Sequence, residues 1–164
     1  MERTFVFGYG NPDRQDDGVA WHVLAALARH LGWQAPASIE DGFLPADGTP
    51  DLAYDLQLTP EIAETIAGYR RVCFIDAHTG DIPDEICMGE VKGEYQHSPF
   101  THHMTPSTCL AMAQTLYGGN PQTILVSIRG YKFGFTQSLS VRTQFLVEQA
   151  AQKIYSWLIN TPNS

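Results

Sequence analysis

The residues of this chain with the clearest chemical potential form a turn of glycines and acids near the start of the sequence. The turn reads Gly8-Tyr9-Gly10-Asn11-Pro12-Asp13-Arg14-Gln15-Asp16-Asp17-Gly18. A phosphate-binding turn of the G-x-G-x-x-G type needs a third glycine, which would fall at Asp13, and a local field that tolerates anions. Because Asp16 and Asp17 add further negative charge, the turn favours a cation or a protonated group as its ligand.

Asp16 and Asp17 have two interpretations. Acids at the start of a helix cap its free backbone N–H groups and complement its dipole. In parallel α/β sheets, ligands bind outside the carboxyl ends of the strands, and this turn follows an apolar strand candidate at residues 4–7. A helix cap and a ligand site both remain open for these carboxylates.

A third acid follows another apolar run. Residues 72–75 read Val-Cys-Phe-Ile and are followed directly by Asp76. If this strand and the one at residues 4–7 are neighbours, their carboxyl ends lie at one edge of the sheet and Asp76 emerges beside the glycine-acid turn. The alternative is a turn-forming aspartate bonded to its own backbone.

Two histidines could complete such a site. His102 and His103 directly precede Met104 and the helix start Thr105-Pro106. Imidazole is a ligand for nickel and zinc, so two carboxylates and one imidazole could form an open metal site. The alternative is that one histidine is exposed and the other bonds locally. Cys73, Cys87 and Cys109 form no C-x-x-C pair, and we expect them to be buried rather than in disulfides or a zinc site.

The elements that must position these groups alternate along the chain. Hydrophobic patterning predicts strands at residues 4–7, 37–41, 71–76, 86–91 and 123–128 and helices at residues 19–31, 60–67, 107–117 and 140–158, with loops at 41–55 and 79–85. Such alternation is typical of an α/β three-layer sandwich with a mostly parallel, twisted sheet of about five strands flanked by helices. We expect residues 1–164 to form a single domain.

Composition excludes several classes of protein. Ten basic and eighteen acidic residues give a net charge of -8, which disfavours nucleic acid and anionic membranes as partners. No apolar run approaches the roughly 20 residues of a membrane span, and no signal peptide is evident, so we expect a cytoplasmic protein. A G-x-S-x-G elbow, an H-E-x-x-H helix and a P-loop are also missing from the sequence.

Five dispersed segments form a more specific pattern. Residues 7–20 follow G-x-G-N-x-x-x-x-D-D/E-x-x-G with Ala20 in place of the last glycine, residues 57–61 read Q-L-T-P-E, residues 74–77 read F-I-D-A, residues 101–106 read T-H-H-M-T-P, and G-Y-K-F at 130–133 is followed by L-S at 139–140. In this order, and over nearly the full length, the chain resembles the hydrogenase maturation endopeptidases. The resemblance implies that it removes the carboxyl-terminal extension from the large-subunit precursor of a nickel-iron hydrogenase.

The resemblance also implies which residues act. By motif position, the metal-contacting and catalytic residues are Asp17, Asp76 and His102, with His103 as the second choice for the histidine. The metal is nickel, which either arrives with the precursor or belongs to the enzyme, and other divalent metals could substitute. A metal-bound water would attack the peptide carbonyl, and Asp16, which binds no metal, would accept a proton.

Two functions of other classes share some of these features. A non-catalytic, metal-dependent assembly factor could bind the precursor tail through the same cluster without cutting it. A small-ligand or nucleotide-binding α/β module is suggested only by the fold class and by Gly8-x-Gly10.

Overall fold

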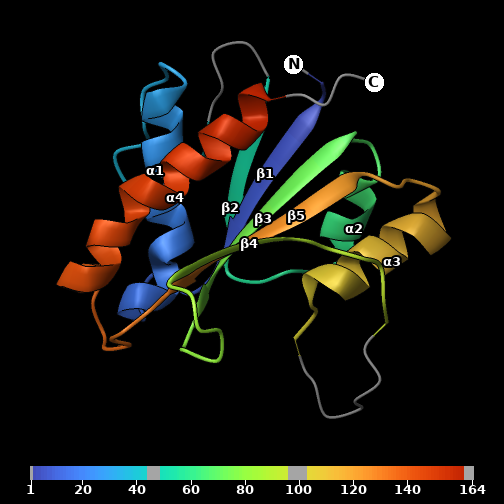
Figure 1. Cartoon of the computed structure of the whole chain (residues 1–164). Helices are drawn as coiled ribbons and strands as arrows, with labels where there is room; N and C mark the ends of the chain where they lie inside the picture. The colour runs from blue at the N-terminus through green and yellow to red at the C-terminus, as the bar shows by residue number, and fades with distance from the viewer. Residues whose placement is uncertain (1, 44–48, 96–102, 161–164) are drawn as a thin grey trace.

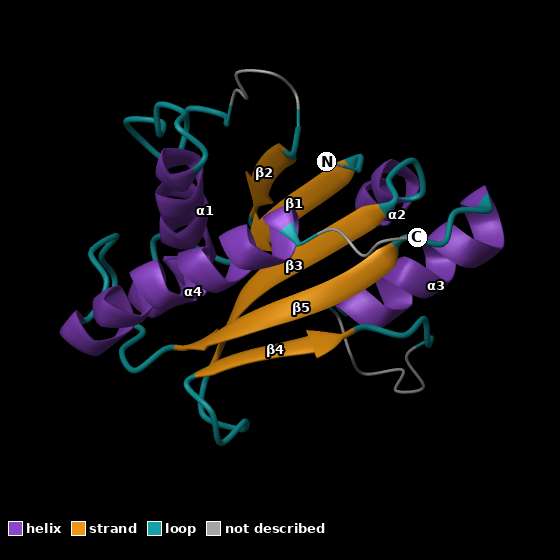
Figure 2. Ribbon diagram, turned by 45° about the horizontal axis from the view of Figure 1, so that its top comes forward, coloured by secondary structure: helices purple, strands orange, loops and turns teal. Residues whose placement is uncertain are grey.

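A five-stranded sheet forms the middle layer of the computed structural model, which describes residues 2–43, 49–95 and 103–160. The strands are β1 (Thr4–Tyr9), β2 (Asp51–Asp55), β3 (Arg71–His78), β4 (Ile86–Glu90) and β5 (Gln122–Arg129). Their order is β2-β1-β3-β5-β4, and only β4, at one edge, is antiparallel to its neighbour (Figure 2). The expected mostly parallel sheet is therefore confirmed.

Two pairs of helices cover the two faces of this sheet. Helices α1 (Val19–His30) and α4 (Val141–Ile159) pack together on one face, and α2 (Pro60–Ile66) and α3 (Pro106–Tyr117) on the other (Figure 1). A short 3-10 helix, Gln15–Gly18, leads into α1. The three-layer sandwich is confirmed, and no helix in the described part of the chain is long and apolar enough to cross a membrane.

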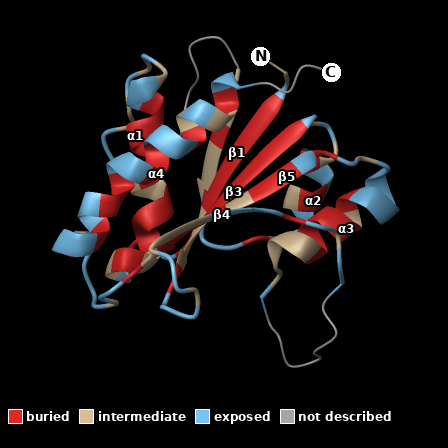
Figure 3. Ribbon diagram, in the orientation of Figure 1, coloured by how far each residue is buried: buried red, intermediate tan, exposed pale blue. Residues whose placement is uncertain are grey.

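The core consists of two apolar layers, one on each face of the sheet. Side chains alternate along a strand, so Val6 packs toward α1 and α4 while Phe5 and Phe7 pack toward α2 and α3. Strands β1, β3 and β5 are buried over most of their length, whereas β4 becomes exposed toward its end (Figure 3). The central strands thus give a rigid base for the residues at their carboxyl ends.

One predicted strand is wrong. Residues 37–41 form no strand; Ser38 and Asp41 bond each other in a turn, and Ile39 is the only large apolar side chain between them. The strand on this side is β2, inside the predicted 41–55 loop. Its acidic ends and the adjacent Pro50 read as a loop, yet Leu52 and Tyr54 both contact the core on the α1 face.

The strand that carries Asp76 continues further than the sequence predicts. We expected it to end at residue 76, but β3 runs to His78 because Asp76, Ala77 and His78 pair with residues 127–129 of β5. Asp76 is therefore part of the sheet rather than of a loop, and its backbone position is fixed by pairing with Ser127 of β5.

The opposite end of the sheet is closed by a buried arginine. Arg71, the first residue of β3, is 1% exposed. Its guanidinium donates to the backbone oxygens of Trp157 at 2.7 Å and Leu158 at 3.4 Å and lies 3.8 Å from the centre of the Trp157 ring. These contacts fasten the end of α4 to the amino end of β3.

Candidate functional site

A pocket of about 430 Å³ opens at the carboxyl ends of β1 and β3, and we call it the acidic pocket. Four of the five motif segments contribute to its walls. The lining residues are Tyr9, Gly10, Asn11, Asp17, Leu56, Gln57, Leu58, Asp76, Ala77, His103 and Met104. Segments that are far apart in the sequence therefore converge at the edge of the sheet where ligands bind in parallel α/β folds.

Asp17 enters the acidic pocket from the short helix before α1. Its carboxylate accepts a hydrogen bond of 2.7 Å from the backbone N–H of Asn11. Gly10 makes this close passage possible, because its φ is +146° and a Cβ there would lie 2.0 Å from the Asp17 carbonyl oxygen. The backbones of Gly10 and Asp17 therefore pass close to each other, which only a glycine at position 10 permits.

Asp76 is held by two hydroxyl groups. Tyr9 Oη donates to one carboxylate oxygen at 2.8 Å, and Ser127 Oγ donates to the other at 2.6 Å. Burial raises the pKa of Asp76, the two hydrogen bonds oppose the rise, and the negative charge of Asp17 adds to it. Burial, followed by Asp76, raises the pKa of Tyr9, so the phenol stays protonated as a donor.

The two predicted histidines differ in what the structure describes. His103 lines the acidic pocket and is exposed to solvent, whereas His102 lies outside the described residues. Within residues 2–43, 49–95 and 103–160, no three His, Cys, Asp or Glu side chains lie close enough together to hold a metal ion. The structure therefore brings together Asp17, Asp76 and His103 in one pocket without a preformed metal cluster among these residues.

Asp16 lies away from the acidic pocket, in an interior network that we call the Asp16 clamp. The side chain is 0% exposed. Its carboxylate accepts hydrogen bonds of 2.6 to 2.9 Å from the backbone N–H groups of Tyr131, Lys132 and Ser140 and from the hydroxyls of Ser140 and Thr143. Burial raises the pKa of Asp16, but the bonds from Ser140, Lys132 and Tyr131 outweigh it and lower the pKa overall.

This arrangement corrects two interpretations of the turn. An inaccessible carboxylate that is fully engaged by donors is unsuited to accept a proton from water, so the predicted role of Asp16 as a base is wrong. Neither acid is the N-cap of α1, because that position is occupied by Gly18, which has no side chain to cap the helix. Asp16 instead ties the glycine-acid turn to the loop between β5 and α4, which carries the fifth motif.

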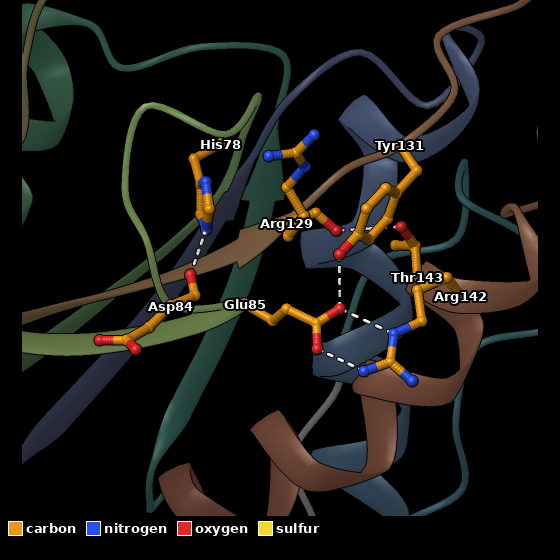
Figure 4. A network of polar contacts seen from close by, with 7 residues as sticks. All are labelled: His78, Asp84, Glu85, Arg129, Tyr131, Arg142 and Thr143. Carbon is orange, nitrogen blue, oxygen red and sulfur yellow. Dashed lines mark hydrogen bonds and ion pairs between the residues drawn. The ribbon is translucent and has the colours of Figure 1, made fainter.

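A polar network joins the same loop to the segment before β4 (Figure 4). Glu85 pairs with the Arg142 guanidinium and accepts a hydrogen bond of 2.6 Å from Tyr131 Oη. His78 contributes differently: Nδ1 accepts from the Gly80 N–H, which leaves Nε2 to donate to the carbonyl oxygen of residue 84 at 2.9 Å. His78 thus fastens a loop and does not line the acidic pocket.

Tyr9 and Ser127 are the two neighbours of Asp76 that the sequence prediction missed. Tyr9 lies inside the first motif, so its position between two glycines was an available signal. Ser127 has no such signal, because it meets Asp76 only through the β3–β5 register. The cysteine prediction holds for Cys73 and Cys109, which are buried, while Cys87 is half-buried; all three are free thiols.

Comparison with known proteins gives a match at the level of structure. No family model and no curated protein matches the sequence. The fold matches the [NiFe] hydrogenase maturation protease HycI from Thermococcus kodakarensis KOD1, with a TM-score of 0.66 at 19% identity over 97% of this chain and 94% of that one. It also matches the hydrogenase maturating endopeptidase HybD from E. coli, with a TM-score of 0.70 at 16% identity over 98% and 94% of the two chains.

A third solved structure extends the comparison to another source. The hydrogenase 2 maturation peptidase from a Thaumarchaeota archaeon matches with a TM-score of 0.60 at 16% identity, over 96% of this chain and 98% of that chain. At these identities the likeness establishes a shared fold, and it spans nearly the whole of each chain.

Proposed function

We propose that this chain is an endopeptidase that removes the carboxyl-terminal extension from the large-subunit precursor of a nickel-iron hydrogenase. The observation that carries the proposal is the convergence of four motif segments in the acidic pocket, with Asp17 and Asp76 in its walls. The shared fold of proteins named as hydrogenase maturation proteases supports it. We also propose that the reaction takes place in the cytoplasm.

In this proposal the nickel belongs to the substrate. Asp17, Asp76 and His102 engage the nickel that the precursor carries, and His103, which lines the acidic pocket, is the second candidate for the histidine. Carboxylate oxygens and imidazole nitrogen suit a divalent nickel ion, and other divalent metals accept the same donors. Ligands shared between enzyme and precursor would restrict cleavage to metal-loaded precursor.

The pocket carboxylates then supply the acid–base chemistry. Water adds its oxygen to the peptide carbonyl carbon, and a carboxylate oxygen of Asp17 or Asp76 that does not bind the nickel accepts the proton that the water releases. The same proton passes to the leaving amine as the C–N bond breaks. The hydroxyls of Tyr9 and Ser127 hold Asp76 in a single orientation for this transfer.

Intact mass spectrometry of the nickel-loaded precursor tests the proposal. We expect loss of one defined carboxyl-terminal peptide with the unmodified chain and no loss with Asp17→Asn, which removes a charge but keeps the side-chain volume. His22→Ala is the control, because His22 lies on α1 and does not line the acidic pocket, so cleavage should persist.

Each other outcome identifies a different function. Binding of loaded precursor without any mass change would indicate the non-catalytic assembly factor. Tight nucleotide binding that is insensitive to Asp17→Asn would indicate the small-ligand module. Cleavage that persists in Asp17→Asn would keep the endopeptidase and remove Asp17 from its site.

A further inference from the structure

A second groove lies directly beside the acidic pocket, with a volume of about 610 Å³. We call it the β4 groove and define it by Cys87 and Gly89 of β4, Leu125 and Ser127 of β5, and Pro106 and Ser107 at the start of α3. The mechanism above assigns no role to this groove.

The β4 groove and the acidic pocket share a wall. Ser127, in the floor of the groove, donates the 2.6 Å hydrogen bond to Asp76 in the pocket. The chain that lines the pocket with Met104 continues at once into the groove with Thr105 and Pro106. The acidic pocket and the β4 groove are therefore adjacent along the Asp76–Ser127 pair.

The floor of the groove is sheet surface formed by β4 and β5. Cys87 and Gly89 lie opposite Ser127 and Leu125 in the antiparallel β4–β5 pair, so these four residues face the same side. Leu125 contacts the core under α2 and α3, which places the groove on that face. Among the described residues, nothing lies within 4 Å of a Cβ added at Gly89, so no described side chain fills the space directly above it.

We propose that the β4 groove binds the carboxyl-terminal extension of the precursor as an extended chain. This inference rests on the proposed function. The lining follows β4 from Cys87 and continues to Val91, the residue after the strand, which corresponds to about 14 Å at strand spacing. A peptide rises by a similar amount per residue, so the groove accommodates about four residues next to the cut bond.

The extension is the part of the precursor that suits this surface. An extended peptide points alternate side chains to one side, and here they meet the apolar Leu125 and the space above Gly89. On the other side of the cut bond, the chain is joined to a folded, metal-containing subunit. Only the extension ends freely and can lie along a groove made for a single chain.

Filling the groove tests the inference. Gly89→Leu places a side chain over the floor without a backbone penalty, because Gly89 does not need a positive φ. We expect kcat/KM for nickel-loaded precursor to fall about tenfold or more, mainly through KM, while Tm is maintained. Gly42→Leu is the matched control, since a Cβ at that exposed glycine also meets no described residue within 4 Å, and its kinetics should be unchanged.

Alkylation of Cys87 gives a readout that is independent of cleavage. Cys73 and Cys109 are 0% exposed, and burial raises the pKa of Cys109 to about 12, so a maleimide should modify Cys87 selectively. Saturating Asp17→Asn protein with loaded precursor should slow this modification about tenfold, whereas precursor lacking the extension should not. Cys87→Ser identifies the modified site by mass.

The outcomes separate this inference from the proposed function. Normal cleavage by Gly89→Leu, or unchanged Cys87 alkylation with bound precursor, would overturn the β4 groove while the endopeptidase stands. Protection by precursor that lacks the extension would assign the groove to the folded body of the subunit and also overturn it. If the unmodified chain neither cleaves nor binds precursor, the proposed function fails and the inference fails with it.

Discussion

The Asp16 clamp and the acidic pocket contain two consecutive aspartates, Asp16 and Asp17, whose carboxylates have opposite surroundings. In the clamp, Asp16 is fully buried and three backbone N–H groups and two hydroxyls satisfy it. In the pocket, Asp17 and Asp76 lie where a ligand can reach them. The Asp16 carboxylate holds two loops together through its hydrogen bonds, whereas the carboxylates of Asp17 and Asp76 line a pocket that is open to a ligand.

The pKa values of Asp16 and Asp76 are shifted in opposite directions. Hydrogen bonds lower the pKa of Asp16 despite burial, so the ionised form favours the folded chain. Burial raises the pKa of Asp76, and the bonds from Tyr9 and Ser127 compensate only in part, so its ionised form disfavours the folded chain. One carboxylate therefore supports the fold at neutral pH, while the other weakens it.

The largest effect should come from Asp76→Asn. We expect cleavage to fall by about a thousandfold, the range that loss of an acid–base group produces. The amide removes the cost of a buried charge but keeps only one acceptor oxygen for the two hydroxyls, so the free energy of unfolding should change by less than about 1 kcal/mol. Single-turnover cleavage and urea denaturation measure the two quantities, and a clear loss of stability would erase the contrast with the clamp.

Asp16→Asn should affect the stability of the fold more than Asp76→Asn does. The amide retains one acceptor oxygen for five donors, and the unsatisfied buried groups should lower the free energy of unfolding by about 3 kcal/mol. Asp13→Asn is the control, because Asp13 is exposed and accepts one hydrogen bond from Gln137, so its effect should stay within about 0.5 kcal/mol. Equal stability of the two variants in urea would mean that the clamp has no energetic weight.

Tyr9→Phe separates positioning from folding inside the pocket. Removing the phenol takes one of the two donors from Asp76, and we expect kcat/KM to fall about tenfold with KM nearly constant. Tyr69→Phe is the matched control, since Tyr69 Oη makes a similar 2.6 Å bond to Asp51 at the other end of the sheet. If both variants lose activity equally, the phenol of Tyr9 acts on the fold rather than on Asp76.

The smallest effect should come from the Glu85–Arg142 ion pair, which lies outside the clamp and is partly exposed. The hydrogen bonds from Arg142 and Tyr131 lower the pKa of Glu85 from 4.5 to about 2. A lowered pKa in the folded chain stabilises it above the ordinary pKa, and this contribution is lost as the pH falls from about 4.5 to about 2.

Arg142→Met removes that contribution. Its Tm should be slightly below that of the unmodified chain at neutral pH, and the two values should converge as the pH approaches about 2. Thermal scans across this range make the measurement. A gap that stays constant with pH would show that Arg142 acts through packing, because its guanidinium also lies 5.4 Å from the Phe145 ring centre.

Local sequence patterns predicted most helices and strands. They could not predict which strands pair with one another in the sheet. The apolar runs of β1 and β3 and the Thr105-Pro106 start of α3 are local signals, and the structure has all three. β2 escaped prediction because its acids flank a short apolar stretch that is recognisable as a strand only once it pairs with β1.

In the acidic pocket too, local signals were predictable and long-range partners were not. The position of Asp76 was predictable because it ends an apolar run, and parallel strands end at one edge. Asp17 was distinguished from Asp16 only by the family resemblance, since the residues alone left both acids open. The roles of Asp16 and Ser127 depend on partners more than 50 positions away in the sequence, at Ser140 and Asp76. Neither residue type reveals such a partner, so only the strand order and the loop packing could assign them.

The Arg71 contact has a practical consequence for handling this protein. It anchors the end of α4 beside the amino ends of the strands, where β1 also starts (Figure 1). The acidic pocket lies at the carboxyl ends of β1 and β3. An affinity tag or a surface linkage attached after α4 would therefore leave the pocket facing the solution. Immobilised protein should capture precursor as well as free protein does, which makes kinetic binding measurements on a sensor surface feasible.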